Sequence, residues 1–286
     1  MAQFHRAGDE GQLQLDPEYV ATARSPLDVA IAARDGAVLE LVRDAVDRRR
    51  ALLAYQPVVQ ATQPDRVAFH EGLIRILDPQ GRVIPAREFI AAVESDETGR
   101  RIDRLALELG LKTLHRNPGL RLSINLSARS IGYPPWNAVL ERGLAASPGI
   151  GERLILEINE SSAMLTPEIV AAFMRRLQRH GVSFALDDFG AGLTSFRHLR
   201  SFYFDIVKID GAFVRGVHAD ADNQVLAGAL LSVARQFDMF TVAESVETGE
   251  DARWLREAGI DCLQGHHFGP PVIRPHWDRR QASSSA

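Results

Sequence analysis

Residues 182–190 have the sequence Val-Ser-Phe-Ala-Leu-Asp-Asp-Phe-Gly, an apolar run that ends in two adjacent carboxylates. A short apolar run bounded by glycine is typical of a strand buried on both faces. Five other apolar segments end in the same way, on a charged or amide side chain: Asn125, Glu157, Lys208, Glu244 and Gln264. Successive ends lie 20 to 36 residues apart, close to one strand plus one helix. This spacing predicts repeated strand–helix units and a largely parallel sheet.

Predicted strands and helices alternate along most of the chain. The predicted strands are Ala51–Val59, Val67–Leu77, Arg121–Ser127, Arg153–Glu160, Val182–Phe189, Ile206–Asp210, Met239–Val246 and Asp261–Phe268. The predicted helices are Arg101–His115, Pro167–His180, Ala221–Phe237 and Gly249–Ala258. Eight strands over this length favour an α/β fold, a modified (β/α)8 TIM-like barrel, over an open sheet. Because residues 60–66 are too few for a helical crossover, we expect the first strand to be antiparallel.

The predicted barrel covers residues 51–276. The segments before and after it differ from it in composition. Residues 1–35 are mixed and polar, and we expect a flexible N-terminal arm. Residues 36–50 predict a helix that packs on the barrel, with Asp35 as its cap and the basic residues 48–50 in its last turn. Residues 277–286 are rich in serine and predict a disordered tail.

Composition excludes several classes of protein. The 286 residues carry 33 Lys and Arg against 37 Asp and Glu, a formal net charge of -4 with no long basic run, so binding to DNA, RNA or an anionic membrane surface is not expected. The single cysteine, Cys262, excludes an intrachain disulfide and favours the cytoplasm. No apolar segment reaches the roughly 20 residues that span a bilayer, and we expect no membrane association.

Acidic and amide side chains are expected to converge at one mouth of the barrel, because parallel strand ends meet there. The members are Asn125, Glu157, Asp187, Asp188 and Glu244, and Glu71 inside the second predicted strand could join them. A lone acid at a strand end usually caps a helix or pairs with a base. So many acids together cannot all remain ionised without cations, and oxygen ligands select Mg²⁺, Mn²⁺ or Ca²⁺ over zinc. Two divalent ions, about 3.5–4 Å apart, would resolve the repulsion in the arrangement used for phosphoester hydrolysis.

Short motifs occur in a dense order between residues 51 and 272. They are Tyr55-Gln56-Pro57, Glu71-Gly72-Leu73-Ile74-Arg75, Pro85 with Phe89-Ile90, Ser123-Ile124-Asn125-Leu126-Ser127, Glu157-Ile158-Asn159-Glu160, Asp187-Asp188-Phe189-Gly190-Ala191-Gly192, Lys208-Ile209-Asp210, Ala243-Glu244-Ser245-Val246-Glu247-Thr248 and Gln264-Gly265. In this order they resemble the EAL-domain cyclic-di-GMP phosphodiesterases, whose fold is a modified (β/α)8 barrel with an antiparallel first strand. The resemblance implies hydrolysis of cyclic-di-GMP to linear pGpG by two-metal activation of water, which lowers the level of this second messenger.

The resemblance also implies a role for individual residues. Two Mg²⁺ or Mn²⁺ ions would be held by Glu71, Asn125, Glu157, Asp187, Asp188 and Glu244. The catalytic group would comprise Lys208, Glu244, Gln264 and Glu160. Among these, Lys208 would hold or polarise the attacking water, Gln264 would orient a metal-bound water, and Glu160 would anchor the loop at residues 189–195. Substrate would contact Gln56, Glu71, Leu73, Arg75, Asn125 and Asp210, with the planar fork of Arg75 on a phosphate.

Departures from the family motifs leave alternatives open. Gly72 stands where the family signature has alanine, and Ser245 stands where glycine is usual. If that glycine has a positive φ, serine is strained there and Glu244 is displaced. One alternative is therefore a weak or inactive cyclic-di-GMP receptor that signals through a protein partner, and another is an interaction module that binds no nucleotide. The resemblance further implies a homodimer through the Phe189–Arg200 loop region.

Overall fold

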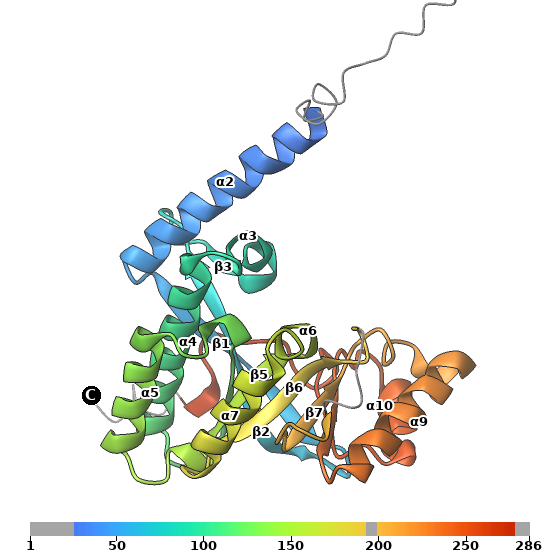
Figure 1. The fold of residues 1–286 in the computed structure, drawn as a ribbon. Helices are drawn as coiled ribbons and strands as arrows, with labels where there is room; N and C mark the ends of the chain where they lie inside the picture. The colour runs from blue at the N-terminus through green and yellow to red at the C-terminus, as the bar shows by residue number, and fades with distance from the viewer. Residues whose placement is uncertain (1–25, 193–198, 278–286) are drawn as a thin grey trace, which may run out of the picture.

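The computed structural model describes residues 26–192 and 199–277, and its centre is a closed barrel (Figure 1). The strands of the barrel are β1 (Ala51–Gln60), β2 (Gln63–Leu77), β4 (Leu122–Asn125), β5 (Leu154–Asn159), β6 (Ser183–Phe189), β7 (Ile206–Ile209), β8 (Phe240–Ala243) and β9 (Cys262–Leu263). From β2 through β4 to β9 each strand pairs in parallel with the next, and β1 closes the ring by pairing antiparallel with both β2 and β9. The predicted barrel with an antiparallel first strand is confirmed. The short strand β3 (Val83–Pro85) extends β2 outside the ring.

Helices cover the outside of the barrel. They are α3 (Ile90–Val93), α4 (Glu97–Arg116), α5 (Pro134–Ala146), α6 (Glu160–Ala163), α7 (Pro167–Gln178), α9 (Ala221–Gln236) and α10 (Gly249–Ala258). Helix α4 begins four residues earlier than predicted, because the Asp96 carboxylate caps it by accepting the Thr98 N–H at 2.9 Å. Helix α5 was not predicted, since its buried face consists of only Trp136, Val139 and Leu140. In the described ranges, no helix has both the length and the apolar character needed to cross a bilayer.

The N-terminal helix α2 (Pro26–Asp47) corrects the predicted boundary between arm and helix. It runs straight through Asp35, the predicted cap, and begins at Pro26, a residue whose fixed φ suits the first helical turn. Its end also differs, because the basic residues 48–50 follow the helix instead of forming its last turn. The last half of α2 packs on α3, α4 and β2, while its first half projects away from the barrel (Figure 1).

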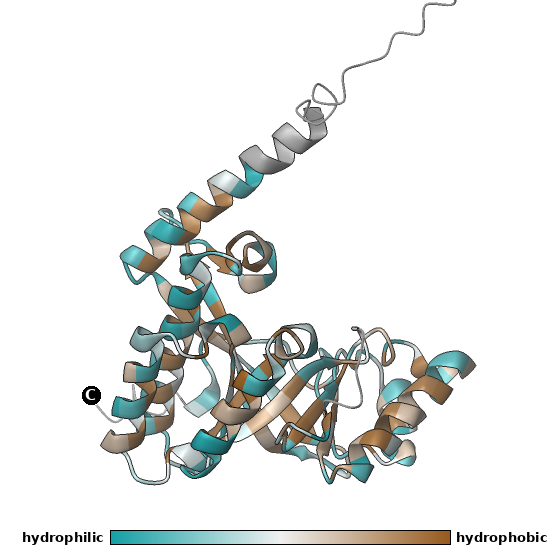
Figure 2. Cartoon of the chain, in the orientation of Figure 1, coloured by the Kyte–Doolittle hydropathy of each residue, from teal (hydrophilic) through white to brown (hydrophobic). Residues whose placement is uncertain are grey.

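The barrel interior is built in two layers. The lower layer is apolar and consists of Val58, Phe69, Ile155, Ala185, Ile206 and Val242. Two residues further along the parallel strands, side chains face the same side again, and there the chain has Glu71, Glu157, Asp187, Lys208 and Glu244. In Figure 2 brown, apolar residues and teal, polar residues both occur along the barrel strands. The strand pattern therefore sets a polar layer on an apolar floor.

The C-terminal end of the described chain packs on the outside of β1 and β2. Trp277 contacts the Tyr55 ring at 5.6 Å and the His70 ring at 4.3 Å, measured between ring centroids. The predicted disordered tail therefore begins too early at residue 277, because this indole is half-buried against the core. The remainder of that tail, residues 278–286, and most of the predicted arm lie outside the described residues.

Candidate functional site

Lys208 stands at the centre of the polar layer and contacts four carboxylates. Its Nζ lies 2.6 Å from Glu244, 2.9 Å from Glu157, 3.2 Å from Glu71 and 3.2 Å from Asp187. These acids lie within or directly after four different strands, and the Lys208 side chain is 1% exposed. The barrel thus brings together groups that are up to 173 residues apart, from Glu71 to Glu244.

Amide side chains fix the orientation of Glu71. Asn125 donates to one carboxylate oxygen at 2.8 Å, and the Gln264 amide donates to the other at 2.6 Å. The same Gln264 amide reaches Gln56 Oε1 at 3.3 Å, and Gln56 donates to the Gly269 carbonyl at 3.1 Å. Glu71 is therefore held as an anion by donors on three sides.

The end of β6 lets two consecutive carboxylates face the same mouth. Neighbouring strand residues normally point to opposite faces, but the pairing of β6 with β7 is irregular between Leu186 and Phe189. Asp188 adopts φ +56°, a left-handed conformation that aspartate tolerates better than most residues. As a result Asp187, Asp188 and Glu244 each offer an oxygen within 4.8 Å of the others. Asn159 donates a hydrogen bond to Asp188 from the neighbouring strand.

The acids of this layer carry more negative charge than Lys208 can balance. Burial, followed by the Glu71 charge, raises the pKa of Glu157 to about 8. Burial and the Asp187 charge raise the pKa of Asp188 to about 6 and that of Glu244 well above its usual value. Burial also acts to raise the pKa of Glu71, but Lys208 and the amide donors lower it overall. The four carboxylates, working against the cost of burial, hold the pKa of Lys208 well above its usual value.

The same residues fit a divalent cation. Raised carboxylate pKa values show a site that gains from added positive charge, and its ligand atoms are carboxylate and amide oxygens. In addition, the Gln264 side-chain oxygen is buried and has no hydrogen-bond partner among the described residues. Asp187, Asp188 and Glu244 form the tightest oxygen cluster and could hold such an ion.

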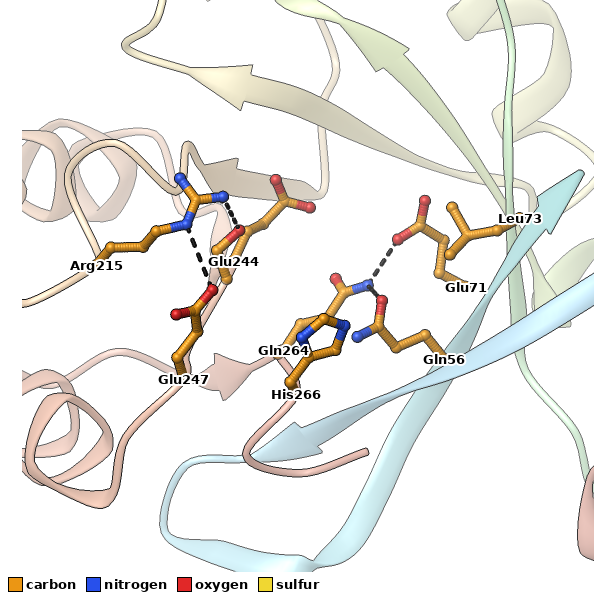
Figure 3. Close-up of a pocket in the computed structure, with 10 residues that line it drawn as sticks. Gln56, Glu71, Leu73, Arg215, Glu244, Glu247, Gln264 and His266 are labelled. Carbon is orange, nitrogen blue, oxygen red and sulfur yellow. Dashed lines mark hydrogen bonds and ion pairs between the residues drawn. The ribbon is translucent and has the colours of Figure 1, made fainter. Parts of the chain in front are cut away.

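Two hollows flank the acidic centre. One has a volume of about 290 Å³ and lies between the Gln56, Glu71 and Gln264 side and the Arg215 and Glu247 side, as Figure 3 shows. The second has a volume of about 340 Å³ and extends over α4, β4, β5 and β6. Its lining includes Glu157, Asp187 and Asp188, so both hollows end at the same cluster of acids.

Several predicted site residues lie farther from Lys208. Leu73 lines the first hollow, and Asp210 lies beside Asp188 and helps to raise its pKa. Arg75 shares its face of β2 with Glu71, yet its guanidinium donates to the Ile74 carbonyl at 3.0 Å and lines neither hollow. Glu160 is buried and accepts the Gly190 N–H at 3.0 Å, at the start of the loop it was predicted to anchor. Residues 193–195 of that loop lie outside the described chain.

Other residues at the site were not predicted. Asn159 could have been found, because it follows Glu157 by two residues and so shares its face of β5. Arg215, Ser245 and Glu247 line the first hollow after turns in the chain. No periodicity places Arg215 there, so only the folded structure identifies it.

Comparison with known proteins agrees with this geometry. Residues 40–271 match the sequence model of the EAL domain. The chain is 32% identical over 80% of its length to the cyclic di-GMP phosphodiesterase PdeB of Shewanella oneidensis, and 31% identical over 81% to the probable cyclic di-GMP phosphodiesterase PdeN of Escherichia coli. It spans only 27% and 45% of those two proteins.

Solved structures show the same fold. The PaMucR phosphodiesterase in complex with c-di-GMP superposes with a TM-score of 0.72 at 27% identity, covering 82% of this chain and 97% of that one. The FimX EAL domain from Pseudomonas aeruginosa bound to c-di-GMP gives a TM-score of 0.73 at 25% identity, covering 82% and 96%.

Proposed function

Because this chain belongs to the EAL domain family, we propose that it is a metal-dependent phosphodiesterase that hydrolyses cyclic-di-GMP to linear pGpG. The observation that carries the proposal is the layer of four acids around the buried Lys208, placed between two hollows. A cyclic dinucleotide has two bases, one on each side of a ring that contains two phosphodiester groups. A centre for phosphate chemistry with a hollow on each side matches that shape.

The proposed reaction is hydrolysis of one phosphodiester. The oxygen of water forms a bond to phosphorus, the bond to the ribose 3′ oxygen breaks, and that oxygen leaves with a proton. Two Mg²⁺ or Mn²⁺ ions, held by Glu71, Asn125, Glu157, Asp187, Asp188 and Glu244, would lower the pKa of the attacking water and neutralise phosphate charge.

The chain's own residues orient and stabilise the reacting groups. Lys208, fixed by four carboxylates, stabilises negative charge that develops on the phosphoryl group. Gln264 positions Glu71 through its 2.6 Å hydrogen bond and presents its free oxygen to a water. Glu160 holds the backbone after β6. Gln56 and Leu73, which line the first hollow, and Asp210, which lies beside Asp188, would contact the substrate. Arg75 must turn away from the Ile74 carbonyl to grip a phosphate.

A second candidate is a receptor that binds cyclic-di-GMP and signals through a protein partner without hydrolysing it. Ser245 favours this candidate, because its φ of +56° puts strain next to the ligand Glu244. Against it, the Glu244 carboxylate still reaches Lys208 at 2.6 Å. We favour the enzyme for that reason.

A hydrolysis assay with a binding control separates the candidates. With Mg²⁺ or Mn²⁺ we expect conversion of cyclic-di-GMP to pGpG, and with Ca²⁺ we expect inhibition, because its longer bonds and looser geometry do not suit this site. Glu71→Gln should lower kcat at least about 100-fold, whereas Glu168→Gln, at an exposed position on α7, should leave it unchanged. Binding without any pGpG at micromolar enzyme would favour the receptor, and absence of binding would favour an interaction module.

We also propose a cytoplasmic homodimer formed through the Phe189–Arg200 region. Glu160 supports this proposal, since its bond to Gly190 links the acidic layer to the start of that loop. Light scattering at high concentration should give twice the chain mass, and a monomer would contradict the proposal.

A further inference from the structure

We propose that Arg215 recognises the acceptor edge of one guanine base of the substrate, and that Ser245 is the residue that positions Arg215 for this contact. The inference rests on the proposed function, since it concerns the first hollow beside the acidic centre. It is carried by residues outside the metal-ligand set, in the wall formed by Arg215, Ser245 and Glu247.

Ser245 is the first part of this wall. It has φ +56°, a conformation in which the Cβ of a non-glycine residue is crowded against the backbone. Its hydroxyl accepts a hydrogen bond from Arg215 Nη2 at 2.9 Å. A strained residue persists where its surroundings impose the conformation, and such positions cluster at ligand sites. Compared with glycine at this position, the serine side chain adds the hydrogen bond to Arg215.

Gly211 is matched to this serine. A Cβ on Gly211 would lie 2.5 Å from the Ser245 hydroxyl oxygen and 2.7 Å from its Cβ, and 3.1 Å from Arg215 Cζ. Both contacts with the serine are closer than real Cβ atoms approach a neighbour. The space left by Gly211 is therefore filled by the serine side chain, and Gly211, Ser245 and Arg215 pack directly against one another.

The guanidinium keeps donors free for a ligand. Arginine has five N–H groups. One is bonded to Ser245, and Nε lies 3.7 Å from the Glu247 carboxylate, which leaves at least three. The Arg215 side chain is 56% exposed, so these groups are accessible from the hollow. Figure 3 shows Arg215 and Glu247 facing Gln56, Gln264 and Glu71 across it.

The neighbouring charge decides which acceptor the arginine recognises. Glu247 beside Arg215 would repel a phosphate, whereas an uncharged base has no such conflict. The O6 and N7 atoms of guanine form the acceptor pair that an arginine fork binds in a bidentate manner, and adenine has an amino group in place of O6. A hollow of about 290 Å³ is at the small end for a drug-sized ligand, so it accepts part of the dinucleotide.

The test compares substitutions against dinucleotides that differ at the base edge. Arg215→Gln should raise KM for cyclic-di-GMP about 5- to 150-fold, the range of one bidentate base contact, with kcat changed less than about threefold. Arg215→Lys should restore only part of this loss, because a lysine is a point donor. Ser245→Gly should raise KM by a smaller factor, since it releases Arg215 without removing it. Arg253→Gln, on the exposed side of α10, is the matched control.

Dissociation constants measured with Ca²⁺ for three dinucleotides identify the contacted group. The Arg215→Gln substitution should weaken binding of cyclic-di-GMP and cyclic-di-IMP, which both keep O6 and N7, and leave cyclic-di-AMP unchanged. An equal loss for all three would show a phosphate contact and overturn the proposal, as would no loss. If the unsubstituted protein binds cyclic-di-GMP without hydrolysing it, the proposed activity fails. The change in each dissociation constant caused by Arg215→Gln still tests the role of Arg215. If the unsubstituted protein binds none of the three, both proposals fail.

Discussion

Gly72 and Ile124 share one space in the wall between β2 and β4. A Cβ on Gly72 would lie 2.7 Å from Ile124 Cδ1 and 3.3 Å from the Ser123 carbonyl oxygen. The missing methyl of the Glu-Gly-Leu motif is thus replaced by the end of an isoleucine from the next strand. The neighbouring Glu71 still accepts hydrogen bonds from Asn125 and Gln264.

Substitution at this pair tests the shared space. Gly72→Ala alone should lower the free energy of unfolding by about 1–3 kcal/mol, because it overpacks a filled site. Combining it with Ile124→Val, which removes the clashing Cδ1 carbon, should recover most of that loss. Urea denaturation of the unsubstituted protein, the two single variants and the double variant gives the coupling free energy between the two positions, and additive effects would contradict a shared space.

Lys208 is the counter-ion of the acids when no metal is present. Lys208→Met should destabilise the metal-free protein by about 3–5 kcal/mol, because it leaves buried carboxylates unpaired. Added Mg²⁺ should raise Tm more in this variant than in the unsubstituted protein, since the ion takes over part of that role. Thermal unfolding in EDTA and in Mg²⁺ measures both effects, and Lys112→Met on exposed α4 surface is the control. Equal Tm values in EDTA would be incompatible with the counter-ion role.

At the scale of elements, α2 joins the barrel through a small cluster of its own. Val42 and Ala45 are fully buried and Val46 nearly so, against Ile76, Phe89, Val93 and Ile102. This cluster is separate from the main core. Among the side chains of α2 that the structure describes, those of its C-terminal half make this attachment.

Shortening one side chain in this cluster should weaken that attachment. Val42→Ala should cost about 1–3 kcal/mol of unfolding free energy, because it removes two buried carbons and leaves a cavity. Glu40→Ala, on the exposed face of the same helix, should cost less than about 0.5 kcal/mol. Chemical denaturation of the two variants measures the difference, and equal costs would show that α2 does not contribute to the core.

Elements with a strict pattern could be predicted from the sequence, and elements set by distant contacts could not. Strand β6 and the end of β7 follow their apolar runs to within one residue at each end. The start of α2 was placed too late, since Asp35 looks like a cap but the helix continues through it. Of the site, Glu157, Asp187 and Glu244 could be predicted because each stands at or near the end of a strand, whereas Glu71 lies inside β2. Arg215 was missed, because its place depends on Ser245 thirty residues away.

At the scale of the whole molecule, a buried acid links folding to pH. Burial raises the pKa of Asp103 to about 7, although Ser130 and the Ser127 N–H donate to it. The native state therefore keeps a proton that the unfolded chain releases near pH 4. Stability from this group is present at low pH and is lost as pH rises from about 4 to about 7, with a slope of up to about 1.4 kcal/mol per pH unit.

Asp103→Asn tests this linkage, because asparagine has the same shape and no proton to lose. The free energy of unfolding of the unsubstituted protein, relative to that of the variant, should decrease as pH rises across this window. Urea denaturation at several pH values measures the difference. Parallel curves would show that Asp103 does not titrate in that range.

The two-layered interior has a consequence for how such proteins change over generations. Each acid of the polar layer is one side chain, and the apolar floor beneath it is packed from other residues. Replacing one acid removes repulsion and leaves the packing beneath untouched. A single substitution could therefore remove the proposed activity while the barrel and the two hollows persist. A fold arranged in this way allows an enzyme that has lost its catalytic activity to serve as a sensor.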